Sequence, residues 1–254
     1  MKKILICGYG NIGIHIRTEF AYIEPEIEIY DKYKEDYCCP EKLETFYDYA
    51  IVCVPTEAKE DGSSNTSEVF EIVQKLKADT ILIKSTIPVG TCEKIGMKNV
   101  VFSPEYYGTT QHSLKSPNFI ILGGEKGYCC KIVQLYQRVK NGTIHYLFTD
   151  WKTAELVKYM ENCWIATKVT FCNEFAKIAE NFGVEYEELR ECFIADERVS
   201  PCHTYVYREK PYYDSHCLNK DIPALLAMCR ESKVEVPLME QVYCSNVVMK
   251  KRKS

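Results

Sequence analysis

The sequence predicts an α/β fold in which a doubly wound, mostly parallel sheet of the Rossmann type is followed by an all-helical domain. A glycine-rich turn lies between an apolar strand and a helix near the amino terminus, and short apolar runs then alternate with helix-like stretches as far as about residue 150. Beyond that point, residues 153–182 contain neither glycine nor proline, which is typical of one long central helix. We therefore divide the chain into a Rossmann domain over 1–150 and a helical domain over 151–254.

The composition excludes several classes of protein. Of the 254 residues, 46% are hydrophobic and 27% are charged, which is typical of a folded globular protein and not of a disordered one. The 32 basic and 36 acidic side chains give a net charge of −4, so the basic surface of a nucleic-acid-binding protein is not expected. No apolar run approaches the roughly 20 residues that span a membrane, so a membrane protein is not expected either.

The amino terminus and the cysteines indicate a cytoplasmic protein. Met1 and two lysines precede an apolar run, as in a secretory signal, but Gly8, Gly10 and Gly13 interrupt this run too early. The chain has 14 cysteines, and without an export signal we expect most of them to be reduced thiols that serve as small core residues.

Short apolar runs predict the strands of the sheet, and the stretches between them predict its helices. The first strand, helix and strand form a βαβ unit, in which the helix extends from the glycine-rich turn through Phe20. Strands are predicted at 3–7, 26–30, 50–54, 80–84, 100–102, 119–122 and 144–148, and further helices at 66–77 and 125–140. Because strands alternate with helices, we expect a mostly parallel sheet that is covered on both faces.

The second domain is predicted to consist of helices. The long helix over 153–182 ends at Gly183, because glycine readily adopts the left-handed conformation that terminates a helix. Shorter helices are predicted at 185–195, 221–232 and 237–250, with a loop-rich stretch as far as Asp214. The chain ends in KKRKS, which we interpret as a solvated terminus.

The glycine-rich turn carries a dinucleotide-binding pattern. Gly8, Gly10 and Gly13 form GxGxxG directly between a predicted strand and helix, so the backbone can approach a pyrophosphate at the helix amino terminus. Asp31 stands at the end of the next strand, where a carboxylate accepts hydrogen bonds from a ribose 2′-hydroxyl and repels a 2′-phosphate. The pattern therefore favours NAD over NADP as the cofactor. The residues expected to contact NAD here are Gly8, Gly10, Asn11, Ile12, Gly13 and Asp31.

Seven segments, taken together, are similar to those of one enzyme family. They are GYGNIG at 8–13, VPT at 54–56, KSTIPVGT at 84–91, SPEYYG at 103–108, KYMENCWIATKVTFCNEFAKIAE at 158–180, DERV at 196–199 and SHCLNKD at 215–221. In this set and order, the sequence resembles the UDP-glucose/GDP-mannose dehydrogenase family. The resemblance implies that the primary alcohol of a nucleotide sugar such as UDP-glucose is oxidised to the carboxylate, for polysaccharide biosynthesis. Two NAD are reduced in succession, and no metal takes part.

The resemblance assigns Cys217 as the catalytic nucleophile. In this family a cysteine captures the aldehyde as a thiohemiacetal, the second hydride leaves to give a thioester, and water hydrolyses the thioester. The neighbouring residues agree with such chemistry, because Lys220 and Asp221 follow by three and four positions. In a helix, this spacing brings a cation that favours the thiolate and a carboxylate that can transfer protons. Lys220 is also expected to contact the substrate.

Lys158 and Asn162 lie one turn apart in the predicted long helix, so they share one face of it. An ammonium and an amide on one face can together stabilise an oxyanion. The resemblance assigns them this catalytic role and a contact with the substrate.

Thr86 and Glu105 follow the strands at 80–84 and 100–102, at the sheet edge where α/β proteins bind their ligands. The resemblance implies that both contact the cofactor, position water and relay protons. Glu105 is also expected to contact the substrate. The VPT segment adds Val54, Pro55 and Thr56 to the residues expected to contact NAD.

Arg198 matches a family arginine that reaches the substrate of the neighbouring subunit. The resemblance therefore implies a homodimer built on the long helix, within a domain that serves both dimerisation and substrate binding. The apolar residues Leu156, Met160, Trp164 and Phe171 suit such packing, although a core within one chain explains them equally well.

Two features depart from the family pattern. Relatives carry GFGGSC before the nucleophile, whereas this chain has YYDSHC at 212–217, and glycines let a backbone approach a ligand more closely than tyrosines do. The family also has a third, C-terminal domain that contacts the nucleotide, and the sequence stops before it. We therefore expect a smaller or more weakly held substrate, a site completed by another polypeptide as in a split enzyme, or an NAD-binding remnant without catalysis.

Two further interpretations stay open. Cys202-His203 and His216-Cys217 could supply four zinc ligands, which would make Cys217 a metal ligand in an NAD-sensing module or scaffold. Alternatively, a two-electron β-hydroxyacid dehydrogenase has a similar architecture. Such an enzyme would use Lys158 as its main catalytic group and would not need Cys217.

Overall fold

The computed structural model describes residues 2–21, 26–107, 117–140 and 142–252. The chain forms two compact units. The N-terminal unit is Met1–Glu57 with Ser64–Lys158, and the C-terminal unit is Ala58–Ser63 with Tyr159–Ser254. Gly108 of the SPEYYG segment and the last two residues of the KKRKS tail lie outside the described residues.

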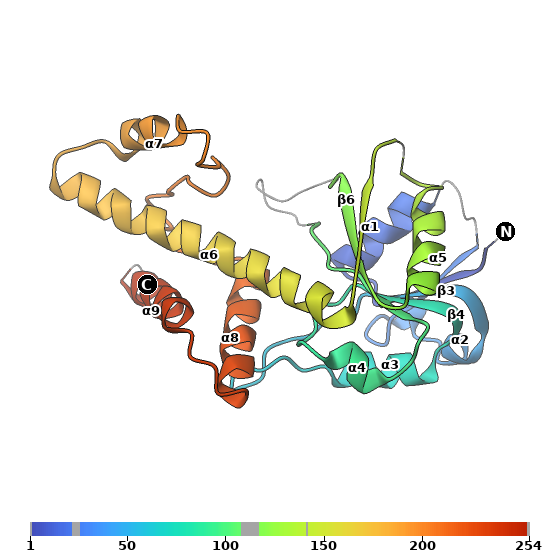
Figure 1. The fold of residues 1–254 in the computed structure, drawn as a ribbon. Coiled ribbons are helices and arrows are strands. Elements are labelled where there is room, and N and C mark those ends of the chain that lie inside the picture. The colour runs from blue at the N-terminus through green and yellow to red at the C-terminus, as the bar shows by residue number, and fades with distance from the viewer. Residues whose placement is uncertain (1, 22–25, 108–116, 141, 253–254) are drawn as a thin grey trace. The chain divides into compact units, whose positions relative to one another are not determined.

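A seven-stranded sheet forms the centre of the N-terminal unit (Figure 1). Its strands are β1 (Ile4–Cys7), β2 (Ile27–Tyr30), β3 (Phe46–Val52), β4 (Lys77–Ile83), β5 (Val100–Phe102), β6 (Phe119–Gly123) and β7 (His145–Thr149). The order across the sheet is β2-β1-β3-β4-β5-β6-β7, and every neighbouring pair is parallel except β5 with β6. This confirms the predicted doubly wound, mostly parallel sheet. The strand order reverses at β1, so a ligand crevice is expected at the carboxyl ends of β1 and β3.

Helices cover both faces of this sheet. α1 (Asn11–Phe20) and α5 (Lys126–Tyr136) pack on one face, and α3 (Ser67–Lys75) packs on the other (Figure 1). The sequence pattern does not predict three short elements, because each is too short to show apolar periodicity. They are η1 (Glu35–Tyr37), α2 (Glu41–Glu44) and α4 (Thr91–Ile95).

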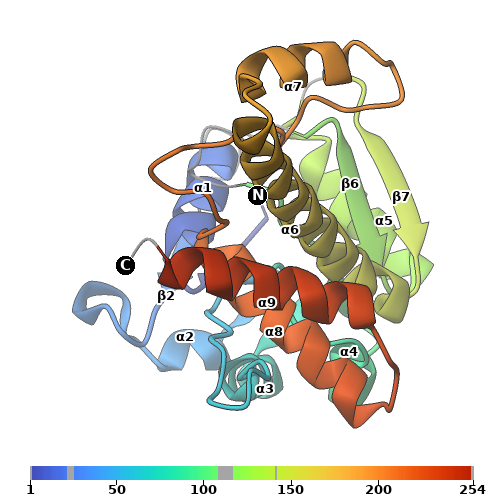
Figure 2. The same ribbon diagram turned by 90° about the vertical axis from the view of Figure 1, so that its left-hand side faces the viewer.

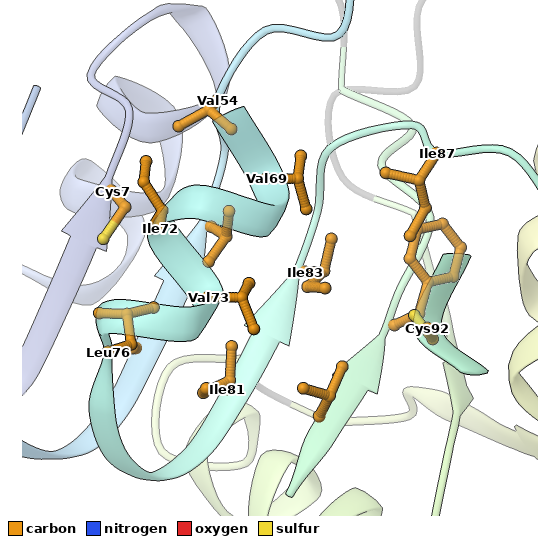
Figure 3. Packing of buried hydrophobic residues seen from close by; sticks show 14 of the residues in the cluster. Cys7, Val54, Val69, Ile72, Val73, Leu76, Ile81, Ile83, Ile87 and Cys92 are labelled. Carbon is orange, nitrogen blue, oxygen red and sulfur yellow. The ribbon is translucent and has the colours of Figure 1, made fainter. Parts of the chain in front are cut away.

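The central strands are buried on both faces of the sheet. In β1, Leu5 and Cys7 belong to a core cluster that includes Ile72 of α3 (Figure 3). The other two residues of β1, Ile4 and Ile6, belong to the cluster on the opposite face, with residues of α1 and α5. Because alternate residues of a strand point to opposite faces, burial on both sides produces the continuous apolar runs that predict these strands.

Several predicted boundaries are wrong by a few residues, among them those of α3 and β3. The helix predicted over 66–77 ends at Lys75, because Lys77 already pairs with Phe46 as the first residue of β4. The strand predicted over 50–54 is β3, which begins at Phe46 and ends at Val52. The VPT segment at 54–56 therefore lies wholly in the loop after β3.

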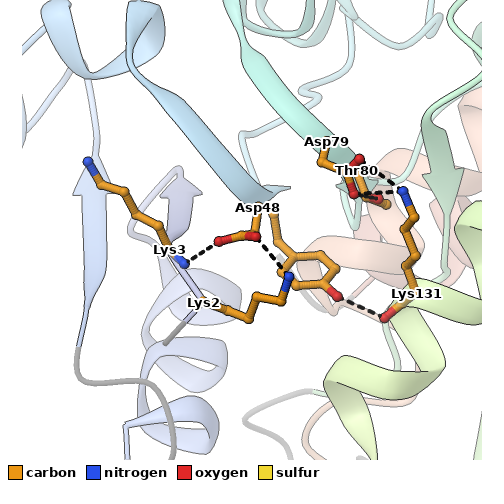
Figure 4. Close-up of polar contacts among 7 residues, drawn as sticks. Lys2, Lys3, Asp48, Asp79, Thr80 and Lys131 are labelled. Atoms are coloured by element: carbon orange, nitrogen blue, oxygen red, sulfur yellow. Dashed lines mark hydrogen bonds and ion pairs between the residues drawn. The ribbon is translucent and has the colours of Figure 1, made fainter.

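Polar contacts join the strands to each other and to α5 near the amino ends of β1 and β4 (Figure 4). Asp48 of β3 accepts hydrogen bonds of 2.9 Å from Lys2 Nζ and 2.8 Å from the backbone N–H of Lys3. Asp79 of β4 forms an ion pair of 2.8 Å with Lys131 of α5. These pairs are partly exposed to solvent, so each adds on the order of 1 kcal/mol or less to stability.

Four helices make up most of the C-terminal unit. They are α6 (Trp151–Asn181), which begins in the N-terminal unit, α7 (Tyr186–Ile194), α8 (His216–Glu231) and α9 (Pro237–Lys251). α6 ends as predicted at Gly183, whose φ of +68° lets the backbone N–H of Val184 reach the carbonyl of Ala179 at 2.8 Å. α8 and α9 lie side by side (Figure 2) and share an apolar core with α6, which includes Ala166, Leu218 and Val242.

α8 begins at His216, five residues before the predicted start at 221. The signal that marks this start is Ser215, whose Oγ accepts a hydrogen bond of 3.3 Å from the backbone N–H of Leu218. A serine in this position caps a helix by pairing one of its first N–H groups. As a consequence, Cys217 lies in the first turn of α8 and not in a loop.

The cysteines are all free thiols, but most of them are not core residues. Five of the fourteen are buried, and the other nine are partly or fully exposed. The expectation that most cysteines fill the core is therefore wrong. Among the described residues, no helix has the length and apolar character needed to cross a membrane.

Candidate active site

The turn after β1 has the geometry of a dinucleotide-binding loop. Gly8 has a φ of +91°, and a Cβ atom there would lie 2.7 Å from the carbonyl oxygen of Cys53. A Cβ atom on Gly13 would lie 2.0 Å from the carbonyl oxygen of Gly8, so neither glycine can carry a side chain. At Gly10 a Cβ atom would meet nothing within 4 Å. Open space beside Gly10, at the amino terminus of α1, is what a pyrophosphate requires.

Asp31 directly follows β2 and is buried beside the glycine-rich turn. One carboxylate oxygen accepts a hydrogen bond of 2.8 Å from the backbone N–H of Tyr9, and the other accepts one of 2.9 Å from the N–H of Tyr33. Each oxygen has a further lone pair for a ribose hydroxyl, and the negative charge disfavours a 2′-phosphate. Together with Asn11 and Ile12 in the first turn of α1, these residues fit NAD.

The loops after β3 and β4 are held together by hydrogen bonds. Thr56 is buried, and its hydroxyl donates to the carbonyl of Thr86 at 2.7 Å. The hydroxyl of Ser85 donates to the carbonyl of Val54, also at 2.7 Å. The backbones of two predicted cofactor segments, VPT and KSTIPVGT, are therefore fixed to each other. Pro55, the middle residue of VPT, is exposed.

Glu105 lies at the carboxyl end of β5 and is held from two sides. Its Oε1 accepts hydrogen bonds of 2.8 Å from the backbone N–H groups of both Tyr106 and Tyr107, and its Oε2 lies 3.2 Å from Lys84 Nζ. Burial alone would raise the pKa of Glu105, but Lys84 and the two N–H groups outweigh it, so this pKa lies below the usual range. Glu105 is therefore a carboxylate near neutral pH and can accept a proton.

Lys84 is not among the site residues predicted from the sequence. The sequence does carry a signal for this residue. Lys84 directly follows an apolar strand, which indicates a buried lysine, and a buried lysine requires an acidic partner. The nearest candidate in the neighbouring strand's loop is Glu105. Recognising the pair requires knowing that β4 and β5 are neighbours in the sheet.

Lys158 and Asn162 lie one turn apart in α6, and both side chains are buried. Lys158 Nζ lies 5.0 Å from the ring centroid of Tyr106 in the N-terminal unit, a distance typical of a cation–π contact. Asn162 makes its hydrogen bond within the C-terminal unit. A joint role for the two side chains at an oxyanion stays a prediction.

Three predicted site residues come together in the C-terminal unit. Asp221 is completely buried, and its Oδ2 accepts a hydrogen bond of 2.6 Å from Asn162 Nδ2. Its Oδ1 pairs with Lys220 Nζ at 2.5 Å. Cys217 lies one helical turn before Asp221, so both are on the same side of α8, and Cys217 is exposed. The exposed thiol of Cys217 is accessible to a substrate, as nucleophilic catalysis requires.

The segment at 212–217 is anchored to α9. Tyr213 is buried in the core of the C-terminal unit, its N–H donates to Asn246 Oδ1 at 2.8 Å, and Asn246 Nδ2 donates to its carbonyl at 3.1 Å. Asp214 accepts hydrogen bonds from Lys210, Lys250 and Asn219, and these lower its pKa. Tyr213, which stands where relatives carry the phenylalanine of GFGGSC, is thus a core residue and does not line a ligand loop.

Arg198 lies in the loop after α7 and is largely exposed, with 88% of its side chain accessible. Its guanidinium forms an ion pair of 2.5 Å with Asp196 of the same DERV segment. An exposed arginine of this kind is available to a ligand or to a second chain.

The zinc-binding alternative has no support in the structure. Cys202 Sγ lies 3.0 Å from His203 Nδ1, but two adjacent residues do not make a zinc site. In the part of the chain that the structure describes, no three or more His, Cys, Asp or Glu side chains gather as metal ligands. His216 and Cys217 therefore do not complete a site with Cys202 and His203.

Comparison with known proteins identifies two matching family models. Residues 39–140 match the NAD binding domain of the UDP-glucose/GDP-mannose dehydrogenase family, and residues 152–247 match the central domain of the same family. The chain is 29% identical over 212 residues to the UDP-glucose 6-dehydrogenase of Rickettsia bellii, a match that covers 77% of this chain and 48% of that protein. The chain thus spans about half the length of this curated relative.

Two solved structures have a similar fold. A UDP-glucose dehydrogenase from the archaeon Pyrobaculum islandicum superposes with a TM-score of 0.82 at 19% identity, over 99% of this chain and 69% of that one. The 3-hydroxyisobutyrate dehydrogenase of Mycobacterium tuberculosis superposes with a TM-score of 0.71 at 15% identity, over 99% of this chain and 93% of that one. At these identities the likeness shows a shared fold only.

Proposed function

Because the chain belongs to the UDP-glucose/GDP-mannose dehydrogenase family, we propose that it oxidises the primary alcohol of a nucleotide sugar to a carboxylate. The balanced reaction consumes one alcohol, one water and two NAD, and it yields one carboxylate, two NADH and three protons. The observation that carries the proposal is the exposed Cys217 one helical turn before Asp221, whose two oxygens are held by Asn162 and Lys220. For the sugar and the base of the substrate, the first candidate that we propose is UDP-glucose.

The N-terminal unit supplies the residues that would hold the cofactor. NAD, when bound, accepts the hydride in each of the two oxidations. The turn from Gly8 to Gly13 leaves room for the pyrophosphate beside Gly10, and Asp31 provides the acceptor for the ribose. Thr56 and Thr86 fix the neighbouring loops, which reduces the ordering that binding must impose.

Cys217 is proposed as the nucleophile in the second half of the reaction. The thiol sulfur attacks the aldehyde carbon, so that a C–S bond forms and the aldehyde oxygen gains a proton, which gives a thiohemiacetal. Loss of a hydride and a proton from this adduct gives a thioester. Water then attacks the thioester carbon, the C–S bond breaks, and the sulfur leaves as the thiolate and is protonated.

Two sets of residues are proposed to assist these steps. Asn162 Nδ2 carries two hydrogens, of which one is donated to Asp221, and the other suits an oxyanion on the substrate together with the ammonium of Lys158. Glu105, an ionised carboxylate, is proposed to accept the proton of the attacking water, and Thr86 is proposed to position that water.

We propose that two copies of the chain associate through α6. Large apolar side chains of the C-terminal unit are exposed along this helix at spacings of three, four and seven residues, as in helices that pack against a partner. They are Met160, Trp164, Phe171, Phe175 and Ile178, and Phe182 directly follows the helix. A second copy is the occupant that the family resemblance favours, and the exposed Arg198 would reach the substrate of that partner.

One observation favours a second candidate function, the two-electron oxidation of a small hydroxy acid. The 3-hydroxyisobutyrate dehydrogenase of Mycobacterium tuberculosis shares the fold over 99% of this chain and 93% of its own. In such an enzyme Lys158 would be the main catalytic group and Cys217 would have no role. The two candidates differ in substrate class and in the need for a thiol.

The test is an assay of the purified chain with NAD and a panel of UDP-sugars, GDP-sugars, simple sugars and β-hydroxy acids, followed by NADH absorbance. NADH formed with a nucleotide sugar supports the proposed function, and NADH formed only with a hydroxy acid supports the second candidate. NAD binding measured by calorimetry, without turnover of any compound, would refute both and leave a cofactor-binding protein.

A further inference from the structure

Lys84 contacts three successive residues of the loop after β5. Its side chain is buried, with 6% accessible, and its Nζ lies 3.2 Å from Glu105 Oε2. The same nitrogen donates hydrogen bonds of 3.3 Å to Ser103 Oγ and 3.4 Å to the carbonyl of Pro104. One ammonium therefore ties the end of β4 to the whole beginning of the SPEYYG segment.

The sheet register places these groups beside each other. Ile83 of β4 pairs with Phe102 of β5, and the backbone N–H of Ser103 donates to the carbonyl of Ile83 at 3.0 Å. The residues that follow these two strand ends, Lys84 and Ser103, consequently emerge side by side. A lysine at this position is costly to bury unless a carboxylate and hydrogen-bond acceptors compensate its charge, and the loop supplies both.

The carboxylate of Glu105 has little freedom as a result. Two backbone N–H groups hold Oε1, and Lys84 holds Oε2, so rotation about the last side-chain bond would break contacts on both sides. We propose that Lys84 is a positioning residue, which keeps Glu105 ionised and in one orientation so that it can accept the proton of water. This inference rests on the function proposed above for Glu105.

Other titratable groups face Glu105 from neighbouring elements. Cys53 follows β3 and Tyr136 lies on α5, and the pKa of each is raised by burial, so both are neutral near pH 7. A small cavity of about 30 Å³ next to Glu105 is also lined by His15, Glu19 and Lys140. Glu19 and Lys140 form an ion pair of 2.5 Å with each other. Lys84 is in direct contact with the carboxylate.

The test is a pH titration of the side-chain carboxyl carbons of glutamate by ¹³C NMR, with the Glu105 signal assigned by its loss in Glu105→Gln. In Lys84→Met, the titration midpoint of Glu105 should rise by on the order of one to three pH units, because an adjacent cation lowers an acid pKa by about that amount. In Lys84→Arg, the midpoint should stay close to that of the unchanged protein. The matched control is Lys131→Met, which removes the exposed partner of Asp79 (Figure 4) and should leave the Glu105 midpoint unchanged.

An unchanged Glu105 midpoint in Lys84→Met would overturn the inference. If the methionine variant does not fold, Lys84→Gln keeps a donor for Ser103 and Pro104 without the charge, and the same upward shift is expected.

Kinetics provide a second readout if the chain turns over a nucleotide sugar. The acid limb of the kcat profile should then move to higher pH in Lys84→Met, while KM for NAD stays unchanged. The NMR shift without turnover of any sugar would refute the dehydrogenase proposal alone. Turnover with an unchanged midpoint would refute the role of Lys84 alone.

Discussion

Asn162 and Asp221 are joined by a hydrogen bond of 2.6 Å from the amide Nδ2 to the carboxylate Oδ2. The two residues come from α6 and α8, both side chains are buried, and Asp221 is also paired with Lys220. A buried carboxylate is tolerated only when its oxygens are satisfied in this way. The bond therefore fixes the first turns of α8, and with them the position of Cys217, relative to the part of α6 that carries Asn162.

Asn162→Ala should destabilise the protein measurably. It leaves Oδ2 of Asp221 without its donor in a buried environment, which costs about 1–3 kcal/mol in the free energy of unfolding. Urea denaturation measures this loss. Asn219→Ala is the matched control, because the Asn219 amide bonds to Asp214 at an exposed position and its loss should cost less. Equal decreases in the free energy of unfolding for the two variants would show that the buried hydrogen bond stabilises the protein no more than the exposed one.

Asp31→Asn should weaken NAD binding and reduce the preference for NAD over NADP. The amide keeps one acceptor oxygen, so one of the two hydrogen bonds from the N–H groups of Tyr9 and Tyr33 persists while the negative charge is lost. Calorimetric titration with both dinucleotides gives the ratio of the two Kd values. Asp36→Asn, an exposed position in η1, should leave that ratio unchanged. A ratio that is also unchanged in Asp31→Asn would contradict the assignment of the ribose acceptor.

Phe171→Glu should convert a dimer into a monomer. Phe171 lies in the middle of the exposed apolar row on α6, and its ring centroid is 4.5 Å from that of Phe175, so a charge there would be buried in the proposed interface. Size-exclusion chromatography with light scattering measures the mass. Leu147→Glu, an equally exposed apolar residue on β7, should keep the mass of the native protein. A native protein that is already a monomer would refute the interface.

Asp214→Asn should lower stability at neutral pH and much less at acidic pH. Three donors lower the pKa of Asp214 below its ordinary value of 3.8, so the folded state binds this proton less tightly than the unfolded state does. The resulting stabilisation, roughly 1 kcal/mol for a partly exposed carboxylate, is present above pH 3.8 and disappears as the pH falls towards the lowered pKa. Urea denaturation of both proteins at neutral pH and near pH 3 should show a shrinking difference. If the difference in unfolding free energy between the native protein and Asp214→Asn is independent of pH, the ionised carboxylate of Asp214 is not what stabilises this segment.

The geometry of the glycine-rich turn agrees with its sequence pattern. Its three glycines and Asp31 are local features, and each acts through the backbone next to it. The contact between Lys84 and Glu105 was not predicted, because it depends on β4 and β5 being neighbours, which no local pattern states. The hydrogen bond between Asn162 and Asp221 was not predicted for the same reason, because these residues lie 59 positions apart and meet only through the packing of α6 and α8.

The prediction for the segment at 212–217 depended on the family glycines that this segment lacks. Its actual surroundings depend on α9, which supplies Asn246 for the backbone of Tyr213 and Lys250 for Asp214. The start of α8 was not predicted, although Ser215 is an ordinary helix-capping residue, because it lies within a segment that matches a catalytic motif of the family.

Cys217→Ser should abolish formation of the carboxylate while NAD binding persists. A serine hydroxyl is a much weaker nucleophile than a thiolate, so the reaction should stop at or before the aldehyde adduct. Cys244→Ser, another exposed cysteine on a helix of the same unit, is the control and should behave like the native protein. Carboxylate production is measured by mass spectrometry of the sugar nucleotide. Unchanged production in Cys217→Ser would remove this residue from the mechanism.

The most direct measurement is the number of NADH molecules formed for each nucleotide sugar consumed by the native protein. NADH is counted by absorbance and the remaining sugar nucleotide by chromatography, in one reaction carried to completion. The four-electron mechanism predicts two NADH per sugar. One NADH per sugar, with an aldehyde or ketone as the product, would contradict it.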